Sequence, residues 1–124
     1  MLSLPPSVRI FTCLEPADLR KSFDGLAQLA REYLGGDPLS GHFFVFRNKR
    51  SDRLKLLYWD TDGYCLWYKR LEQGRFVWPS KTASVGRHGL EMRAADFAML
   101  LDGVDLSSVQ RRTRYRRPGA VVPA

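Results

Sequence analysis

The central third of the chain combines aromatic and cationic side chains in a way that restricts both its fold and its use. Residues 41–79 contain three or four short runs of strand-forming residues, separated by turn-forming residues. All three tryptophans of the chain lie in this block. A strand that only fills a core is more aliphatic and carries fewer charges. Aromatic side chains interleaved with cations are typical of surfaces that bind an anionic partner with stackable rings, such as a nucleic acid.

The positive charge of the chain is concentrated in two segments. The formal net charge is +7 at pH 7. Residues 42–81 hold nine Lys and Arg side chains against four Asp and Glu, and residues 109–124 hold five arginines and no acid. The rest of the chain has more acids than cations. This asymmetry favours a polyanionic partner, although an arginine-rich tail is also compatible with simple solvation.

Length and composition predict one domain, residues 1–108, followed by an arginine-rich mobile tail, residues 109–124. With 124 residues and 44% hydrophobic content, the chain is large enough to bury a core without disulfides. No apolar run approaches the roughly 18 residues of a membrane span, and the first residues lack a secretory pattern, so we expect a cytoplasmic protein with no membrane partner. Cys13 and Cys65 are expected to be reduced thiols.

The succession of patterns predicts an α+β fold. A strand is expected over residues 8–13. A long helix is expected to follow, with its start at residues 16–18 or, after a looser turn, at Ser22, and its end at Gly35 and Gly36. Further strands are expected over residues 42–47, 53–59, 64–71 and 75–78, and a short helix over residues 94–101. Residues 80–92 show no clear period. Tight connections between the central strands predict an antiparallel meander sheet of four to five strands, with both helices packed on one face.

The turn before Gly63 determines which side chains share a face. If Gly63 closes a three-residue loop, Lys55 lies opposite Lys69, on the same face as Trp59 and Trp67. Like charges directly opposite each other are unfavourable unless something neutralises them. Such a face would suit a phosphate with a neighbouring base or sugar. A two-residue loop would shift the pairing by one residue and mix the two faces.

These considerations define a candidate binding surface of aromatic and cationic residues. Its members are Arg53, Lys55, Trp59, Trp67, Lys69, Arg70, Arg75 and Trp78 from the sheet, and Arg111, Arg112 and Arg114 from the tail. Taken singly, each tryptophan is explained more simply by packing, and long cations often extend along apolar surface. The number of cations that interleave with the aromatic residues is what favours binding.

The sequence predicts neither an enzyme nor a cofactor. Asp60 and Asp62, together with Asp18 or Asp24, could hold Mg²⁺ for phosphoryl transfer. Turn chemistry explains Asp60 and Asp62 equally well, and no glutamate at motif spacing completes such a site. The chain contains no nucleophile elbow, no phosphate-binding glycine loop and no cluster of zinc ligands. A metal-dependent nuclease that uses Asp60 and Asp62 is the weakest of the alternatives.

Long runs of unusual sequence carry a resemblance to a known family. They are D-L-R-K-S-F-D-G-L at 18–26, D-P-x-S-G-H-F-F-V-F-R-N at 37–48, D-R-L-K at 52–55, L-Y-W-D at 57–60, D-G-Y-C-L-W-Y-K-R-L at 62–71 and G-R-F-x-W-P at 74–79. Residues 8–106 thereby resemble the small accessory proteins, called TnpB, of the insertion-sequence-66 family of bacterial transposable elements. Leu19 stands where methionine is expected, and Ser51 where glycine is common.

The resemblance implies a role in transposition beside a separate, larger transposase of the DDE type, with no catalytic residues in this chain. We therefore expect an accessory protein that binds DNA, with low affinity on its own, or the transposase of the same element, or both. The alternative is a protein–protein adaptor that contacts the transposase and never contacts DNA. The salt dependence of binding distinguishes the DNA-binding protein from the adaptor, because affinity from phosphate contacts falls steeply with ionic strength.

The arginine-rich tail generates a first prediction. Five arginines without a carboxylate cannot build a core, but they can hold phosphates. Deletion of residues 109–124 is therefore expected to leave the melting temperature nearly unchanged and to weaken binding to unrelated DNA and to element-end DNA by similar factors. Thermal denaturation and titration with both DNAs check this. A large loss of stability, or a loss of affinity confined to element-end DNA, would contradict it.

Overall fold

The computed structural model describes residues 5–80 and 88–103 of the chain. Five strands and two helices lie within them. In chain order they are β1 (Ile10–Cys13), α1 (Phe23–Glu32), β2 (Phe43–Arg47), β3 (Arg53–Asp60), β4 (Gly63–Arg70), β5 (Gly89–Met92) and α2 (Ala94–Asp102). The predicted α+β class is confirmed.

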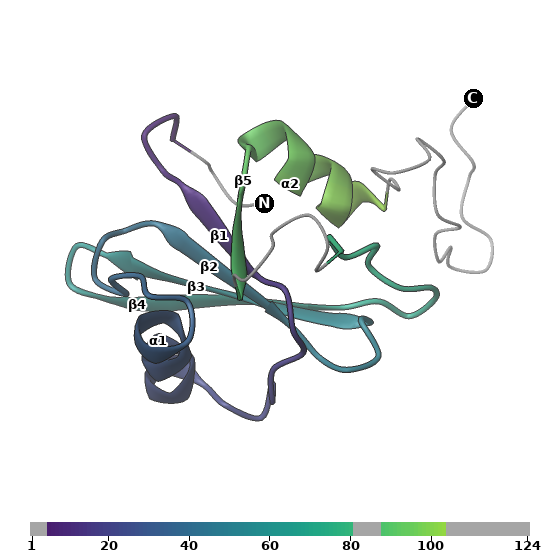
Figure 1. Cartoon of the computed structure of the whole chain (residues 1–124), viewed down its shortest axis with the longest axis horizontal. Helices are drawn as coiled ribbons and strands as arrows, with labels where there is room; N and C mark the ends of the chain where they lie inside the picture. Colours follow the sequence, from purple (N-terminus) through teal and green to yellow (C-terminus); the bar gives the residue numbers. More distant parts are fainter. Residues whose placement is uncertain (1–4, 81–87, 104–124) are drawn as a thin grey trace.

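The five strands form one mixed sheet in the order β4-β3-β2-β1-β5 (Figure 1). β2, β3 and β4 make the antiparallel meander that the sequence predicts. β1 runs parallel to β2, and the chain between them contains α1. β5 pairs antiparallel with the free side of β1. The last strand of the chain therefore lies beside the first one.

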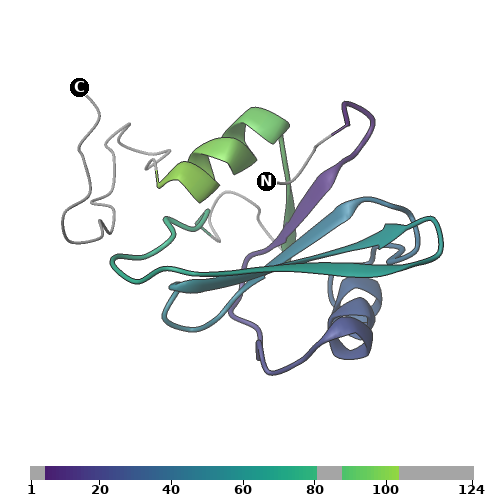
Figure 2. The same cartoon turned by 180° about the vertical axis from the view of Figure 1, so that it is seen from behind.

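Each face of the sheet is covered by one helix. Phe43 and Val45 of β2 belong to an apolar cluster on the α2 side, and Phe44 and Phe46 belong to a second cluster on the α1 side. Figures 1 and 2 show α1 and α2 on opposite sides of the strands. The expectation that both helices pack on one face is therefore wrong. α1, with ten residues, is longer than α2, with nine.

The physical reason is the composition of β2. All four residues from Phe43 to Phe46 are buried, although successive side chains of a strand point to opposite faces. Both faces therefore need an apolar cover. Leu26, Ala27 and Ala30 of α1 supply it on one side. Phe97 and Leu100 of α2 supply it on the other.

Two strand assignments from the sequence are wrong. Residues 75–78 form no strand, because this segment packs against the β2–β3 loop and β1 instead of pairing with β4. The backbone N–H of Phe76 donates to the carbonyl of Ser51 at 2.7 Å, and the indole Nε1 of Trp78 donates to the carbonyl of Cys13 at 2.7 Å. Residues 89–92, which show no period, form β5. Pairing with β1 and an ion pair between Glu91 and Arg9 stabilise these residues as a strand.

The β3–β4 turn has two residues rather than three. Asp60 pairs with Gly63, so Lys55 lies opposite Tyr68 and Lys69 lies opposite Leu54. Thr61, with φ of 51°, takes the left-handed conformation in this turn. The register that places the two lysines opposite each other is therefore wrong.

The helix ends follow local rules more closely. Ser22 is the N-cap of α1, as expected, although its side chain makes no capping hydrogen bond. Gly103 ends α2 with φ of 85°, a conformation that glycine adopts without strain. Within residues 5–80 and 88–103, no helix is long and apolar enough to cross a membrane.

The two-sided core generates a second prediction. Leu56 and Leu57 are adjacent in β3, point to opposite faces and are both fully buried. Replacing either one with alanine is expected to lower the free energy of unfolding by about 2–5 kcal/mol, because each change leaves a cavity under a helix. Leu39→Ala is the control, since Leu39 is 53% exposed. Urea denaturation measures all three, and a small effect at either core position would contradict the two-sided core.

Candidate nucleic-acid interface

The structure does not assemble the aromatic and basic sheet face expected from the sequence. Lys55 and Trp59 point to the α1 side, whereas Lys69 and Trp67 point to the α2 side, because the two-residue turn shifts the pairing by one residue. The expected combination of two lysines beside two tryptophans on one face is therefore absent from the described sheet.

Lys55 has a structural environment. Lys55 is only 8% exposed, and its Nζ donates a hydrogen bond to the backbone carbonyl of Lys21 at 2.9 Å. The same ammonium lies 4.9 Å from the centre of the Tyr68 ring. Lys55 thus ties the segment that precedes α1 to the sheet. It is not placed to meet a phosphate.

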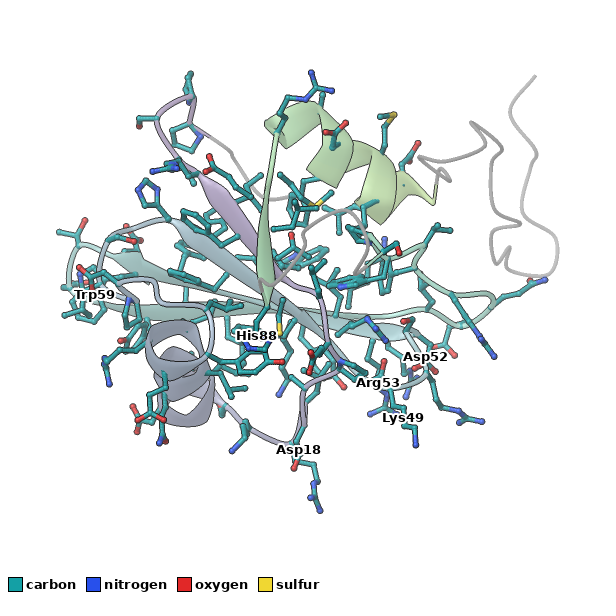
Figure 3. The ribbon with its side chains drawn as sticks, viewed as in Figure 1. Asp18, Lys49, Asp52, Arg53, Trp59 and His88 are labelled. Carbon is teal, nitrogen blue, oxygen red and sulfur yellow. The ribbon has the colours of Figure 1, made fainter. Side chains whose placement is uncertain are left out.

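The three tryptophans are also separated. Trp67 and Trp78 pack against the apolar cluster on the α2 side. Trp59 meets Tyr64 edge to face, with ring centres 5.1 Å apart, at the end of the β3–β4 hairpin. Figure 3 shows Trp59 at the opposite end of the sheet from Arg53. The tryptophans therefore form no common stacking platform.

The remaining predicted residues divide into three groups. Arg53 and Arg70 are exposed and lie directly opposite each other on β3 and β4. Lys69 is half-buried opposite Leu54, and Arg75 is exposed but lies outside the sheet strands. Arg111, Arg112 and Arg114 lie outside the described residues.

The structure does bring together a different group of cations, at the end of the sheet where β2 connects to β3. We call it the basic surface. Its members are the cations Arg20, Lys49, Arg50, Arg53 and Arg70, together with Tyr68, around which they are arranged. All but Arg70 line a cavity of about 400 Å³, with Ala17, Asp18, Leu19, Asn48 and Asp52. Asp18, Lys49, Asp52 and Arg53 lie at this end of the molecule in Figure 3.

Arg53, Arg70 and Tyr68 form the centre of the basic surface. The two arginines are cross-strand neighbours, an arrangement that costs stability unless a negative charge offsets it. Arg53 Nη1 donates to the hydroxyl of Tyr68 at 3.1 Å, and Arg70 Nε donates to Glu72 at 2.9 Å. Tyr68 is 48% exposed, which is high for a large aromatic residue on a strand. A stackable ring is thus flanked by two guanidinium groups.

The β2–β3 loop is held in a defined shape by Asn48. The side-chain oxygen of Asn48 accepts from the backbone N–H groups of Asp52 and Arg53, at 3.1 and 3.0 Å. Its Nδ2 donates to the Asp52 carboxylate at 2.7 Å. Ser51 adopts φ of 57°, a left-handed conformation, which explains why glycine suits this position. The loop therefore presents Lys49 and Arg50 from a fixed base.

Arg47 anchors this loop to the rest of the fold. Its guanidinium donates to the Ser51 hydroxyl and to the carbonyl of Leu14, at 3.1 and 3.3 Å, and lies 5.7 Å from the Trp78 ring centre. Burial lowers the pKa of Arg47 from its ordinary value. Arg47 acts on the basic surface only through the position of the loop.

The charges of the basic surface are incompletely balanced. Asp18 is bound by Arg20 at 2.8 Å, and hydrogen bonds from Arg20 lower the pKa of Asp18 to about 2. Asp52 is engaged by Asn48. Lys49 and Arg50 are exposed and have no carboxylate partner in the part of the chain that the structure describes. These two cations are available for an anionic ligand.

The carboxylates considered for metal binding lie elsewhere. Asp60 and Asp62 are exposed in the β3–β4 turn, at the opposite end of β3 from Arg53. Among residues 5–80 and 88–103, no three His, Cys, Asp or Glu side chains come together in a group that could hold a metal ion. Cys13 and Cys65 are free thiols, and burial raises the pKa of Cys13, so its thiol is not activated.

Sequence reasoning missed four members of the basic surface: Arg20, Lys49, Arg50 and Tyr68. A signal existed for Lys49 and Arg50, because the loop from Asn48 to Asp52 is recognisably polar and basic. No local signal places Arg20 beside them, since it reaches this end of the sheet through the chain path between β1 and α1. No local signal marks Tyr68 either, since its place beside Arg53 depends on the register of β3 and β4.

Comparison with known families now adds to this geometry. The sequence matches the family described as "IS66 Orf2 like protein" over residues 8–111, which is most of the chain. The chain belongs to this family. The resemblance expected from the sequence motifs is confirmed, and family membership associates the protein with IS66 insertion sequences and with transposition.

Two curated relatives from Sinorhizobium fredii (strain NBRC 101917 / NGR234) match along almost their whole length. The uncharacterized protein y4jC is 37% identical over 98% of this chain and 99% of its own. The uncharacterized protein y4hO is 35% identical over 96% of this chain and 100% of its own. No solved structure matches the chain.

The position of Lys55 generates a third prediction. Lys55→Met keeps the aliphatic stem but removes the ammonium, which leaves the Lys21 carbonyl without its donor and removes the contact with the Tyr68 ring. The free energy of unfolding is expected to fall by about 1–3 kcal/mol. Urea denaturation measures it. The salt dependence of any DNA binding is expected to stay unchanged, and a flatter dependence would show that Lys55 meets a phosphate after all.

Proposed function

We propose that this protein is a non-enzymatic accessory factor of transposition that binds DNA phosphates through the basic surface. The observation that carries the proposal is the cross-strand pair of Arg53 and Arg70 beside the exposed ring of Tyr68. The ion pair of Arg70 with Glu72 offsets part of the repulsion between the two guanidinium groups, and a phosphate between them would offset the rest. The resulting contact would carry no sequence information, as is usual for backbone contacts.

The surroundings of this pair suit a nucleic-acid strand. Lys49 and Arg50 extend the positive charge from the loop, and Tyr68 offers a face on which a base or sugar can pack. The cavity of about 400 Å³ is large enough for a phosphate and an adjacent group of this kind. The basic surface therefore combines cations with an aromatic ring, as the sequence suggested, but the set of residues differs from the predicted one.

The protein is assigned no reaction of its own under this proposal. Cutting and joining of DNA would belong to the separate transposase of the same element, which is the second expected partner. A factor with weak affinity for DNA alone would act by strengthening or orienting the larger enzyme on its substrate. Such a division of work needs phosphate contacts on this chain but no carboxylate cluster.

The alternative is an adaptor that binds the transposase and never contacts DNA. It is supported by the exposed apolar residues Phe23, Leu39 and Met99, which are 42%, 53% and 36% exposed. They lie on three separate elements, namely the start of α1, the loop before β2, and α2. Scattered apolar residues of this kind are normal on protein surfaces and define no single patch. The basic surface is the stronger candidate for this reason.

A fourth prediction tests the proposal directly. The purified full chain is expected to bind a duplex with the element-end sequence, with an affinity that falls steeply between low and physiological salt. The double variant Lys49→Ala/Arg50→Ala is expected to flatten the slope of log affinity against log salt by about two units if each cation meets one phosphate. Fluorescence anisotropy at several salt concentrations measures the slope.

The matched control is Arg31→Ala/Arg93→Ala, which removes the same charge from α1 and from the start of α2, away from the basic surface. Its slope is expected to stay close to that of the unaltered chain. Equal slopes for both double variants would show that only net charge matters. Salt-independent binding to the transposase, with no binding to DNA, would favour the adaptor.

A further inference from the structure

The two edges of the sheet are unequal. β5, at one edge, has four residues, whereas β4, at the other, has eight. β4 pairs with β3 without a bulge along its whole length and contains no proline. Natural proteins protect exposed edges by short strands, bulges, prolines or charges. Only Lys69 and Arg70 at its last two positions charge β4, so most of this edge lacks such protection.

The backbone groups that face outward from β4 can be identified from the register. Because a two-residue turn joins Asp60 to Gly63, these residues form a hydrogen-bonded pair, and every second pair after them does so too. The hydrogen bond from Leu71 N–H to the Asp52 carbonyl, at 2.7 Å, agrees with this alternation. The outward groups therefore belong to Tyr64, Leu66, Tyr68 and Arg70, and none has a backbone partner among the described residues.

We propose that β4 pairs antiparallel with β4 of a second copy of this chain, which joins two five-stranded sheets into one of ten strands. Outward-facing residues must pair with outward-facing residues. The register centred on Leu66 satisfies this requirement, with Leu66 opposite Leu66 of the second copy and Tyr64 opposite its Tyr68. Tyr68, whose ring is half exposed in one chain, then gains an aromatic neighbour.

Charge complementarity favours a second copy over an unrelated strand. The turn at the start of β4 carries Asp60 and Asp62, and the end of β4 carries Lys69 and Arg70, of which Arg70 also forms an exposed ion pair with Glu72 of its own chain. In the antiparallel register centred on Leu66, the basic end of each strand meets the acidic turn of the other. Asp62 then lies opposite Arg70 of the second copy, once at each end of the interface. The charge pattern of β4 is therefore complementary to that of β4 in a second copy.

The same symmetry places the two basic surfaces on one side. The two-fold axis of such a pair is perpendicular to the joined sheet, so corresponding faces point in the same direction. Arg53, Tyr68 and Arg70 share the face that α1 covers, and so would their equivalents. The pairing does not depend on DNA binding, because it rests on the strand edge and its charges alone.

A fifth prediction follows, and it is tested without DNA. The full chain is expected to have about twice the monomer mass of 14.2 kDa at micromolar concentration, by light scattering or sedimentation. Asp62→Arg or Arg70→Asp alone places like charges together at both ends of the interface and is expected to weaken dimerisation at least tenfold. The double variant Asp62→Arg/Arg70→Asp restores opposite charges and is expected to recover most of the affinity.

Recovery of dimerisation in the double variant would be specific to a contact between two chains. Within one chain, Asp62 and Arg70 stand at opposite ends of β4, roughly 25 Å apart for an extended strand, so they cannot compensate each other there. Circular dichroism and the melting temperature at high dilution check that every variant is folded. Single variants that remain dimeric, or a double variant that stays monomeric, would overturn the proposed register and contact.

Hydrogen exchange identifies other occupants of this edge. In the proposed dimer, the amides of Tyr64, Leu66, Tyr68 and Arg70 are protected, and dilution to the monomer exposes them. A monomer with these amides protected would show that another segment of the same chain covers the edge. A monomer with rapid exchange would show a free edge, available to a strand of the transposase. Either result would overturn the proposal of a second copy.

Discussion

The fold depends on β2, the central strand, whose residues from Phe43 to Phe46 are all buried. A strand that is apolar on both faces cannot lie at the surface of a two-layer protein, so one helix must cover each side. α1 and α2 fulfil this requirement with short apolar stripes. The order of the sheet follows, because β3 and β1 flank β2 and leave β4 and β5 as the edges.

This arrangement limits which surfaces of the sheet are accessible. Both faces of the sheet are occupied by helices, and the aromatic residues that suggested a binding face mostly pack under them or at the ends of strands. Among the described residues, the end of the sheet at the β2–β3 loop and the outer edge of β4 are both accessible. Cations gather at the first, and unpaired backbone groups at the second. The two surfaces meet at Tyr68 and Arg70, which belong to both.

The sequence predicted the α+β class, the chain segments that form α1 and α2, and the β2–β3–β4 meander, because these depend on local patterns of turns and periodicity. The prediction failed where the length of one turn determines which face of the sheet a side chain occupies. The β3–β4 turn differs by one residue from the expected one, and this difference moves Lys69 and Trp67 to the other face. The sequence of β5 has no strand periodicity of its own, and its extended conformation depends on hydrogen bonding to β1. The run Phe43–Phe46 contained the evidence for a two-sided sheet, because uninterrupted apolar strands are typical of strands covered on both faces.

The position of β5 has a consequence for how the protein is made. β5 and α2 are the last described elements of the chain, yet β5 completes the pairing of β1, the first strand, and α2 covers Ile10, Val45 and Leu56. While the chain emerges from the ribosome, the βαβ unit and the meander can form, but one apolar side of the sheet stays open. This side can close only after residues 89–102 have been synthesised, so a product that terminates before them would expose it to chaperones and proteases.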